Sequence, residues 1–190
     1  MTRHNNGEMV TPEKEDINEM LELNYKIYPK EWHVSKEYVL SIMERNPFVY
    51  RVYKENKQVK GIHSLFPLPK TVYEQVLTGE ISEKSLCEHI IDYKKPGDVY
   101  LYLISIIVDI HSQKAKEYTK HLLYDMVSQL HWIEKQDQNI KEIGAIAISK
   151  DGERILQRIG FSHSHSLKEE GISYPVFRSS KESILQAITL

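Results

Sequence analysis

The sequence predicts an α/β fold of the α+β type, with a mixed central sheet of about six or seven strands flanked by helices. Two apolar runs, Val99–Val108 and Ile143–Ile148, are typical of strands that are buried on both faces in the middle of a sheet. Between them, residues 114–135 repeat apolar side chains at helical spacing. Before them, two shorter runs at 48–53 and 59–66 are typical of an antiparallel hairpin.

Length and composition limit the function classes. The chain has 190 residues, of which 41% are hydrophobic and 27% charged, so we expect one globular domain, 1–190, with a substantial core. The net charge of -2 gives no reason to expect a nucleic-acid partner. No apolar run is long enough to cross a bilayer, and the start MTRHNNGEM is not typical of a secretory signal. We therefore expect a cytoplasmic protein with no membrane partner.

The first third of the chain predicts two helices and a hairpin. Met9–Val10 is a short strand, and Thr11 with Pro12 is typical of the start of a helix, which Pro29 ends. Ser35 is the expected cap of a second helix. The hairpin follows, and Gly61 inside its second strand indicates a bulge or a close backbone approach.

An insert at about 67–98 separates the hairpin from the central strand. Pro67 and Pro69 should end the hairpin. Two short helices follow, the first stopped by Gly79 and the second capped by Ser82. We expect this helical insert either to cover one side of a substrate site or to form the contact of a homodimer.

The last third predicts short elements around the second buried strand. Residues 155–159 mark a short helix that ends at Gly160. A strand begins at Phe161, Ser164–Gly171 reads as a loop, and Ile172–Arg178 reads as the last strand. A tail helix is expected at about 183–188.

This order of elements resembles the GNAT superfamily of acyl-coenzyme A-dependent N-acyltransferases over nearly the whole chain. Leu122–Leu123 is similar to the apolar pair of the family's long helix, and Arg154–Phe161 (RILQRIGF) is similar to its short-helix segment. The insert, with FPLP at 66–69 and YEQVLTGEI at 73–81, resembles a bacterial subgroup of GNAT-like proteins with a degenerate coenzyme-binding motif.

The resemblance implies how the coenzyme is held. The strands at 99–108 and 143–148 should be parallel and splayed, with the pantetheine arm added beside them and the pyrophosphate at the N-terminus of the next helix. The co-substrate is acetyl-CoA or another acyl-CoA, the acceptor is an amine of a small molecule or a protein, and no metal is implied. The residues that the resemblance places at the coenzyme are Ile107, Val108, Gln113, Lys114, Ala115, Lys116, Glu117, Tyr118, Thr119 and Ser149.

The loop before the long helix departs from the family pattern, because its two glycine positions hold Glu117 and Thr119. A register shifted by one residue puts Lys116 and Tyr118 there instead. A Glu117 carboxylate that faced the ligand would repel pyrophosphate. Three lysines in or near the first helical turn either offset that charge or form a solvated first turn: Lys114, Lys116 and Lys120.

The catalytic groups of the family are also replaced. Leu156 stands where many members carry the tyrosine that protonates the thiolate, and Ser149 stands at a position often held by asparagine. Candidate substitutes are Ser149, Tyr118 and Tyr174. Candidate bases are Tyr100 and Tyr102 on one face of the central strand, which would otherwise be core residues, and Glu31 and His33, which would otherwise be plain surface.

Two functions fit these patterns. The first is an acyl-CoA-dependent N-acyltransferase that acts on an amine. The second is a catalytically inactive GNAT-like module that binds acyl-CoA or another protein. His163 and His165 have the spacing of metal ligands, but no cysteine or carboxylate pattern accompanies them, so we expect no metal.

Overall fold

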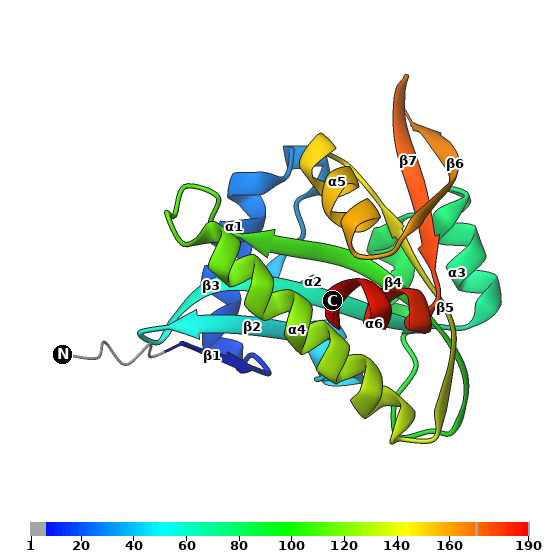
Figure 1. The fold of residues 1–190 in the computed structure, drawn as a ribbon, viewed down its shortest axis with the longest axis horizontal. Coiled ribbons are helices and arrows are strands. Elements are labelled where there is room, and N and C mark those ends of the chain that lie inside the picture. The colour runs from blue at the N-terminus through cyan, green and yellow to red at the C-terminus, as the bar shows by residue number, and fades with distance from the viewer. Residues whose placement is uncertain (1–6, 170, 190) are drawn as a thin grey trace. The chain divides into compact units, whose positions relative to one another are not determined.

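Residues 7–169 and 171–189 are described by a computed structural model of the chain (Figure 1). Seven strands form one sheet in the order β1-β2-β3-β4-β5-β7-β6. β4 and β5 are parallel, whereas β1–β2, β2–β3, β5–β7 and β6–β7 are antiparallel. The mixed sheet of six or seven strands flanked by helices, with a parallel central pair, is therefore confirmed. The first six residues, on which the expected absence of a signal depends, lie outside the described part.

The strands are β1 Gly7–Val10, β2 Tyr50–Glu55, β3 Gln58–Leu68, β4 Gly97–Val108, β5 Gln138–Ile146, β6 Ser162–Glu169 and β7 Ile172–Ser179. The α-helices are α1 Ile17–Ile27, α2 Lys36–Arg45, α3 Lys70–Leu77, α4 Ala115–Glu134, α5 Lys150–Arg158 and α6 Lys181–Thr189. The described residues also contain the 3₁₀ helices η1 Lys14–Asp16, η2 Lys30–Trp32 and η3 Glu83–His89.

The chain divides into two compact units. The first contains the described part of Met1–Ser64 together with Ser105–Met126, and the second contains Leu65–Ile104 together with the described part of Val127–Leu190. β3, β4 and α4 each contribute residues to both. The expectation that 1–190 is a single domain stays a prediction.

In the first unit, the β2–β3 hairpin carries the bulge that Gly61 predicts. Tyr53 lies opposite Gly61 and Lys54 opposite Val59, so Lys60 is the extra residue. A Cβ built on Gly61 would lie 3.1 Å from Leu122 Cδ1 of α4. The glycine therefore allows both the bulge and the close packing of α4 on the hairpin. Figure 1 shows α4 lying across β2 and β3.

The core of the first unit contains a polar cluster of three side chains. His63 is fully buried, and its Nε2 lies 2.8 Å from Asp125 Oδ2, while Arg51 donates from Nε at 2.9 Å and from Nη2 at 2.8 Å. Burial by itself would raise the pKa of Asp125, but the hydrogen bonds from Arg51 and His63 outweigh burial and lower that pKa to about 2. Burial lowers the pKa of His63. The cluster is thus an ionised Asp125–Arg51 pair beside a neutral histidine.

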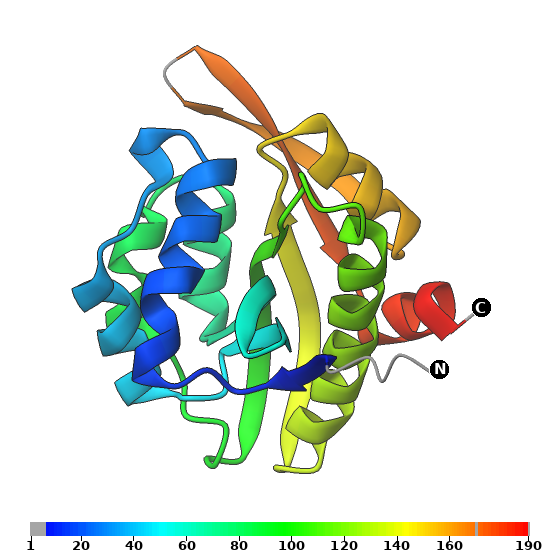
Figure 2. The ribbon, with the colours of Figure 1, turned by 90° about the vertical axis from the view of Figure 1, so that its left-hand side faces the viewer.

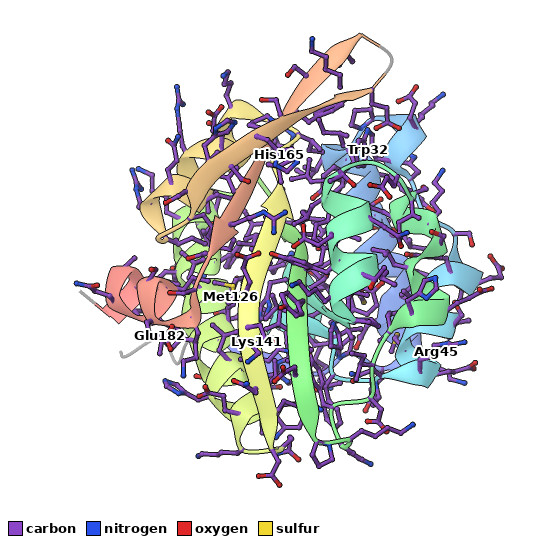
Figure 3. The ribbon with its side chains drawn as sticks, turned by 90° about the vertical axis from the view of Figure 1, so that its right-hand side faces the viewer. Trp32, Arg45, Met126, Lys141, His165 and Glu182 are labelled. Atoms are coloured by element: carbon purple, nitrogen blue, oxygen red, sulfur yellow. The ribbon has the colours of Figure 1, made fainter. Side chains whose placement is uncertain are left out.

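In the second unit, α3 of the insert packs on β5 at Gly144. A Cβ built there would lie 2.6 Å from Tyr73 Oη and 2.7 Å from Leu77 Cδ1. The Tyr73 hydroxyl donates to Glu142 Oε1 of β5 at 2.9 Å, and Arg178 donates to the same oxygen at 2.6 Å. Figure 3 shows β4 and β5 side by side in this unit, with Lys141 on β5. Glycine at position 144 therefore lets the insert sit directly on the parallel pair.

Three expected boundaries in the first half of the chain were wrong. The first helix begins as η1 at Lys14 rather than at Pro12, because Asp16 Oδ2 accepts from the Glu13 N–H at 2.8 Å in a capping box. Pro67 does not end β3, which continues to Leu68, and the Pro67 carbonyl accepts from the Ile91 N–H at 2.9 Å. The helix capped by Ser82 is the 3₁₀ helix η3 and ends at His89.

Two expected boundaries in the second half of the chain were also wrong. β5 is the strand expected at 143–148, but it begins earlier, at Gln138, and ends at Ile146. Ser164–Gly171 is not a loop, because β6 continues to Glu169 in pairing with β7; Glu170 lies outside the described residues. Figure 2 shows this β6–β7 hairpin projecting past α5 within the second unit. The side chains of β6 are mostly exposed, so no apolar alternation marked it as a strand.

Candidate coenzyme and transfer site

The register pairs of the parallel strands end partway along β4. Register pairs run from Gly97 opposite Gln138 to Tyr102 opposite Gly144, whereas β4 itself continues to Val108. Within the described residues, no part of β4 after Tyr102 is in register with β5. The register pairs therefore end at Tyr102, where the predicted splay would begin.

The loop from β4 to α4 forms its turns without glycine. The Asp109 carboxylate accepts from the His111 N–H at 3.2 Å, and Ser112 Oγ accepts from the Lys114 N–H at 3.2 Å. The Ser112 carbonyl also accepts from the Ala115 N–H, at 3.1 Å, so Ser112 closes a turn that leads into α4. Side-chain oxygens thus order a loop that contains no glycine.

Two of the charged side chains in this first turn have partners within the first unit. Lys114 Nζ lies 2.6 Å from Glu55 Oε1, and this hydrogen bond lowers the pKa of Glu55 and raises that of Lys114. Glu117 Oε1 lies 3.9 Å from His121 Nε2, one turn further along α4, and is therefore directed away from the helix N-terminus. Gln113 and Lys116 are exposed. The expected repulsion between Glu117 and a bound pyrophosphate is thus reduced. Lys114 is paired with Glu55.

The remaining residues expected at the coenzyme differ in exposure. Tyr118 is buried, packs on Tyr53 and donates from its hydroxyl to Glu55 Oε2 at 2.9 Å, which makes it a core residue. Thr119 donates from Oγ1 to the Ala115 carbonyl at 2.9 Å. On β4, Ile107 is buried and Val108 is half-buried.

Ser149 belongs to the second unit, where it is exposed and caps α5. Its Oγ accepts from the Gly152 N–H at 3.0 Å. Tyr174 is half-buried on β7 opposite Leu167 of β6.

Tyr102 lies beside a carboxyl group that the sequence did not indicate. Its side chain is buried, and its hydroxyl donates to Glu83 Oε1 of η3. Burial raises the pKa of Glu83 to about 7, although the Tyr102 hydrogen bond acts in the opposite direction, and the Glu169 carboxylate raises it further. No spacing links positions 83 and 102, so only the placement of the insert on β4 could have revealed this pair.

Of the other candidate bases, Tyr100 and His33 pack against neighbouring side chains, and Glu31 lies on the surface. Tyr100 packs on Tyr73, with ring centroids 5.1 Å apart. The His33 ring packs at a tilt on Tyr25, with centroids 4.4 Å apart, and its Nε2 lies 2.8 Å from the Tyr28 carbonyl oxygen, so it holds the segment between α1 and α2. Glu31 is exposed in η2.

Neither a metal site nor a membrane span is found in the part of the chain that the structure describes. No three His, Cys, Asp or Glu side chains there are grouped as metal ligands would be. His165, which Figure 3 shows on β6, places Nε2 2.9 Å from the Leu77 carbonyl oxygen. None of the described helices combines the length and the apolar character needed to cross a membrane.

Three solved structures have this arrangement of elements. The loading GNATL domain of CurA from Lyngbya majuscula is similar with a TM-score of 0.71 and 12% identity, covering 93% of this chain and 98% of that domain. An N-acetyltransferase from Staphylococcus aureus Mu50 is similar with a TM-score of 0.60 and 16% identity, covering 93% and 99%. The GphF GNAT-like decarboxylase, solved with isobutyryl-CoA, is similar with a TM-score of 0.66 and 10% identity, covering 92% and 99%.

By sequence, no family model matches the chain, and no curated protein matches it either. The structural matches nevertheless span almost the whole chain and almost the whole of each of those proteins. The fold is that of the GNAT superfamily.

Proposed function

We propose that this chain with the GNAT fold is an acyl-CoA-dependent N-acyltransferase, which transfers an acyl group, acetyl foremost, to an amine of a small molecule or a protein. The observation that carries the proposal is that the register pairs between β4 and β5 end at Tyr102–Gly144, while β4 continues to Val108. A strand with free peptide groups along one side can take up an extended amide-bearing chain by strand addition. The pantetheine arm of coenzyme A is such a chain.

The first turn of α4 supports binding of the coenzyme phosphates. The N-terminus of a long helix attracts anions through its unpaired N–H groups and its dipole. Hydrogen bonds to the Asp109 and Ser112 side chains order the loop before this turn without glycine, Ala115 adds only a methyl group, and Glu117 is directed away. We assign the phosphate contacts to backbone N–H groups and to the exposed Gln113 and Lys116. We assign Tyr118 and Lys114 a supporting role without phosphate contact, because both donate hydrogen bonds to Glu55.

The transfer step needs groups that accept and donate protons and a group that polarises the thioester carbonyl. The amine lone pair attacks the thioester carbonyl carbon, a C–N bond forms, and the C–S bond breaks to release coenzyme A thiolate. The amine loses one proton and the thiolate gains one, so the products are an amide and free coenzyme A. A backbone N–H near the β4–β5 separation would polarise the carbonyl as an oxyanion hole does.

The same features favour the enzyme over an inactive module. The sequence-based reason for inactivity was a loop with an acidic side chain and no glycine. That side chain lies beside His121, and hydrogen-bonded caps order the turn. The loss of the family tyrosine at Leu156 does not remove proton-transfer chemistry, because a tyrosine hydroxyl and a carboxyl meet at Tyr102 and Glu83.

We expect acetyl-CoA to raise the melting temperature of the protein by mass action. At about one hundred times its Kd, a ligand of the folded state stabilises by about 2.7 kcal/mol. Lys116→Glu should weaken the affinity about fivefold, since reversing a charge at a helix N-terminus changes binding of an anion by about 1 kcal/mol. Differential scanning fluorimetry with acetyl-CoA, longer acyl-CoAs and free coenzyme A measures both effects.

Lys26→Glu is the control for this experiment, because Lys26 is an exposed lysine near the C-terminal end of α1. It should leave the coenzyme-induced shift unchanged. Absence of any shift at millimolar acyl-CoA would contradict both the transferase and the acyl-CoA-binding module.

A further inference from the structure

We propose that Tyr102 and Glu83 form the proton relay of the transfer step, with Tyr102 as the catalytic residue that takes the amine proton and Glu83 as the positioning residue that receives it. The inference rests on the proposed function. It goes further by naming a proton acceptor that lies in the insert, outside the elements to which the GNAT resemblance assigns chemistry.

The first support is the position of Tyr102 in the sheet. It is the last residue of β4 in register with β5, so its side chain leaves β4 at the level where the register pairs end. Side chains alternate along a strand, which places Tyr102 on the same face as Tyr100. Tyr100 contacts Tyr73 of α3, and this face is therefore the one that the insert covers.

The second support is the way Glu83 is held. Ser82 caps η3, with its Oγ accepting from the Lys84 N–H at 3.3 Å, and so fixes the backbone on both sides of Glu83. Glu83 as a residue is half-buried, and its carboxyl accepts the hydrogen bond of the Tyr102 hydroxyl. A fixed backbone and a directed hydrogen bond hold the carboxyl in one orientation toward the tyrosine.

The third support is the charge environment of the pair. Burial raises the pKa of Glu83 to about 7, with Tyr102 on β4 lowering it and Glu169 on β6 raising it. A carboxyl with that pKa exchanges its proton near neutral pH, which is where a general base works best. The Asp125 carboxyl differs from that of Glu83, because the hydrogen bonds from Arg51 and His63 lower the pKa of Asp125 to about 2 and keep it ionised.

These observations define the proton path. As the amine nitrogen bonds to the carbonyl carbon, its proton passes to the Tyr102 oxygen, and the Tyr102 hydroxyl proton passes to Glu83 Oε1. Tyr102 therefore ends neutral, and Glu83 ends protonated. When coenzyme A thiolate has left, Glu83 returns the proton to solvent and the thiolate takes one from solvent, so the relay is ready for the next cycle.

The test compares Glu83→Gln and Tyr102→Phe with the wild type and with Glu88→Gln, an exposed glutamate of the same 3₁₀ helix. Release of coenzyme A is measured with an amine panel over about pH 6 to 9, and acetyl-CoA binding is measured by thermal shift. In the wild type, kcat/KM should rise through a pKa of about 7 as Glu83 becomes a carboxylate. Glu83→Gln should lose this step and about 10²–10⁴-fold in kcat/KM, with the thermal shift retained.

Tyr102→Phe should also keep the thermal shift and lose at least about tenfold in kcat/KM. Glu88→Gln should match the wild type. Equal activity and an equal pH profile in wild type and Glu83→Gln would overturn the relay while leaving the transferase standing. A wild type that binds acyl-CoA and acylates no amine would instead overturn the proposed function, and the relay with it.

A second measurement covers the case in which Glu83→Gln fails to fold. The side-chain carboxyl of Glu83 is followed by ¹³C NMR in the wild type as the pH changes. A pKa near 7 supports the relay. A pKa near the ordinary glutamate value of about 4.3 would overturn it, because such a carboxyl is too weak a base at neutral pH.

Discussion

Asp125→Ala should lower the free energy of unfolding by about 3–5 kcal/mol, because it leaves a buried histidine and a guanidinium without their shared acceptor. His63 has no exposed surface, and Arg51 makes two hydrogen bonds to the Asp125 carboxylate. The Nδ1 atom of His63 already lacks a partner, so the imidazole depends on Asp125 alone for its hydrogen bond. Urea unfolding followed by circular dichroism measures the change.

The control is Asp151→Ala, which breaks the exposed ion pair of Asp151 with Arg154 in α5. Exposed pairs of this kind contribute between about 0 and 1 kcal/mol. A loss below about 1 kcal/mol in Asp125→Ala would show that the cluster does not hold the first unit together.

The stabilisation by Asp125 also has a defined pH dependence. The folded pKa of about 2 lies below the unfolded value of about 3.9. The contribution of Asp125 is therefore complete above about pH 4 and is lost as the pH falls toward 2. In Asp125→Asn, this part of the acid sensitivity should be absent.

Gly144→Ala should destabilise the protein by about 1–3 kcal/mol, because the added methyl group overlaps the side chains that anchor the insert. Its Cβ would lie 2.6 Å from Tyr73 Oη and 2.7 Å from Leu77 Cδ1. Relief of the overlap requires Tyr73 to move, which breaks its hydrogen bond to Glu142. Thermal and urea unfolding of the variant measure the cost.

A double-mutant cycle isolates the cause. In a Tyr73→Phe background the nearest atom to the new methyl group is absent, so Gly144→Ala should cost less by at least about 0.5 kcal/mol. An equal cost in both backgrounds would contradict the contact between α3 and β5 as the origin of the effect.

The sequence predicted the sheet best where one face or both faces are apolar. The runs that became β4 and β5 are buried, and their parallel pairing followed from the helix between them. β6 was not predicted over its full length, because its sequence, SHSHSLKE, is polar and its side chains are mostly exposed. Its pairing with β7 makes it a strand. Pro67 was misread because its carbonyl still bonds to Ile91, an interaction that depends on the fold of the insert.

The candidate site was predicted only in part, for a related reason. The β4–α4 loop was identified from its place between a strand and a helix, but its sequence suggested only missing glycines. Its order comes from Asp109 and Ser112, and the direction of Glu117 is set by its approach to His121. Glu83 could not be found from sequence, because the hydrogen bond to Tyr102 joins elements whose separation along the chain carries no pattern.

The most direct test of the proposed activity is a mass-spectrometric assay of the acceptor. The purified protein is incubated with acetyl-CoA and a panel of small amines and peptides, and both acetylated product and free coenzyme A are quantified. We predict one molecule of N-acetylated product for each coenzyme A released. Acetyl-CoA that binds but is never consumed would contradict the transferase, as would loss of carbon dioxide from an α-carboxylated acyl-CoA without acylation of any amine.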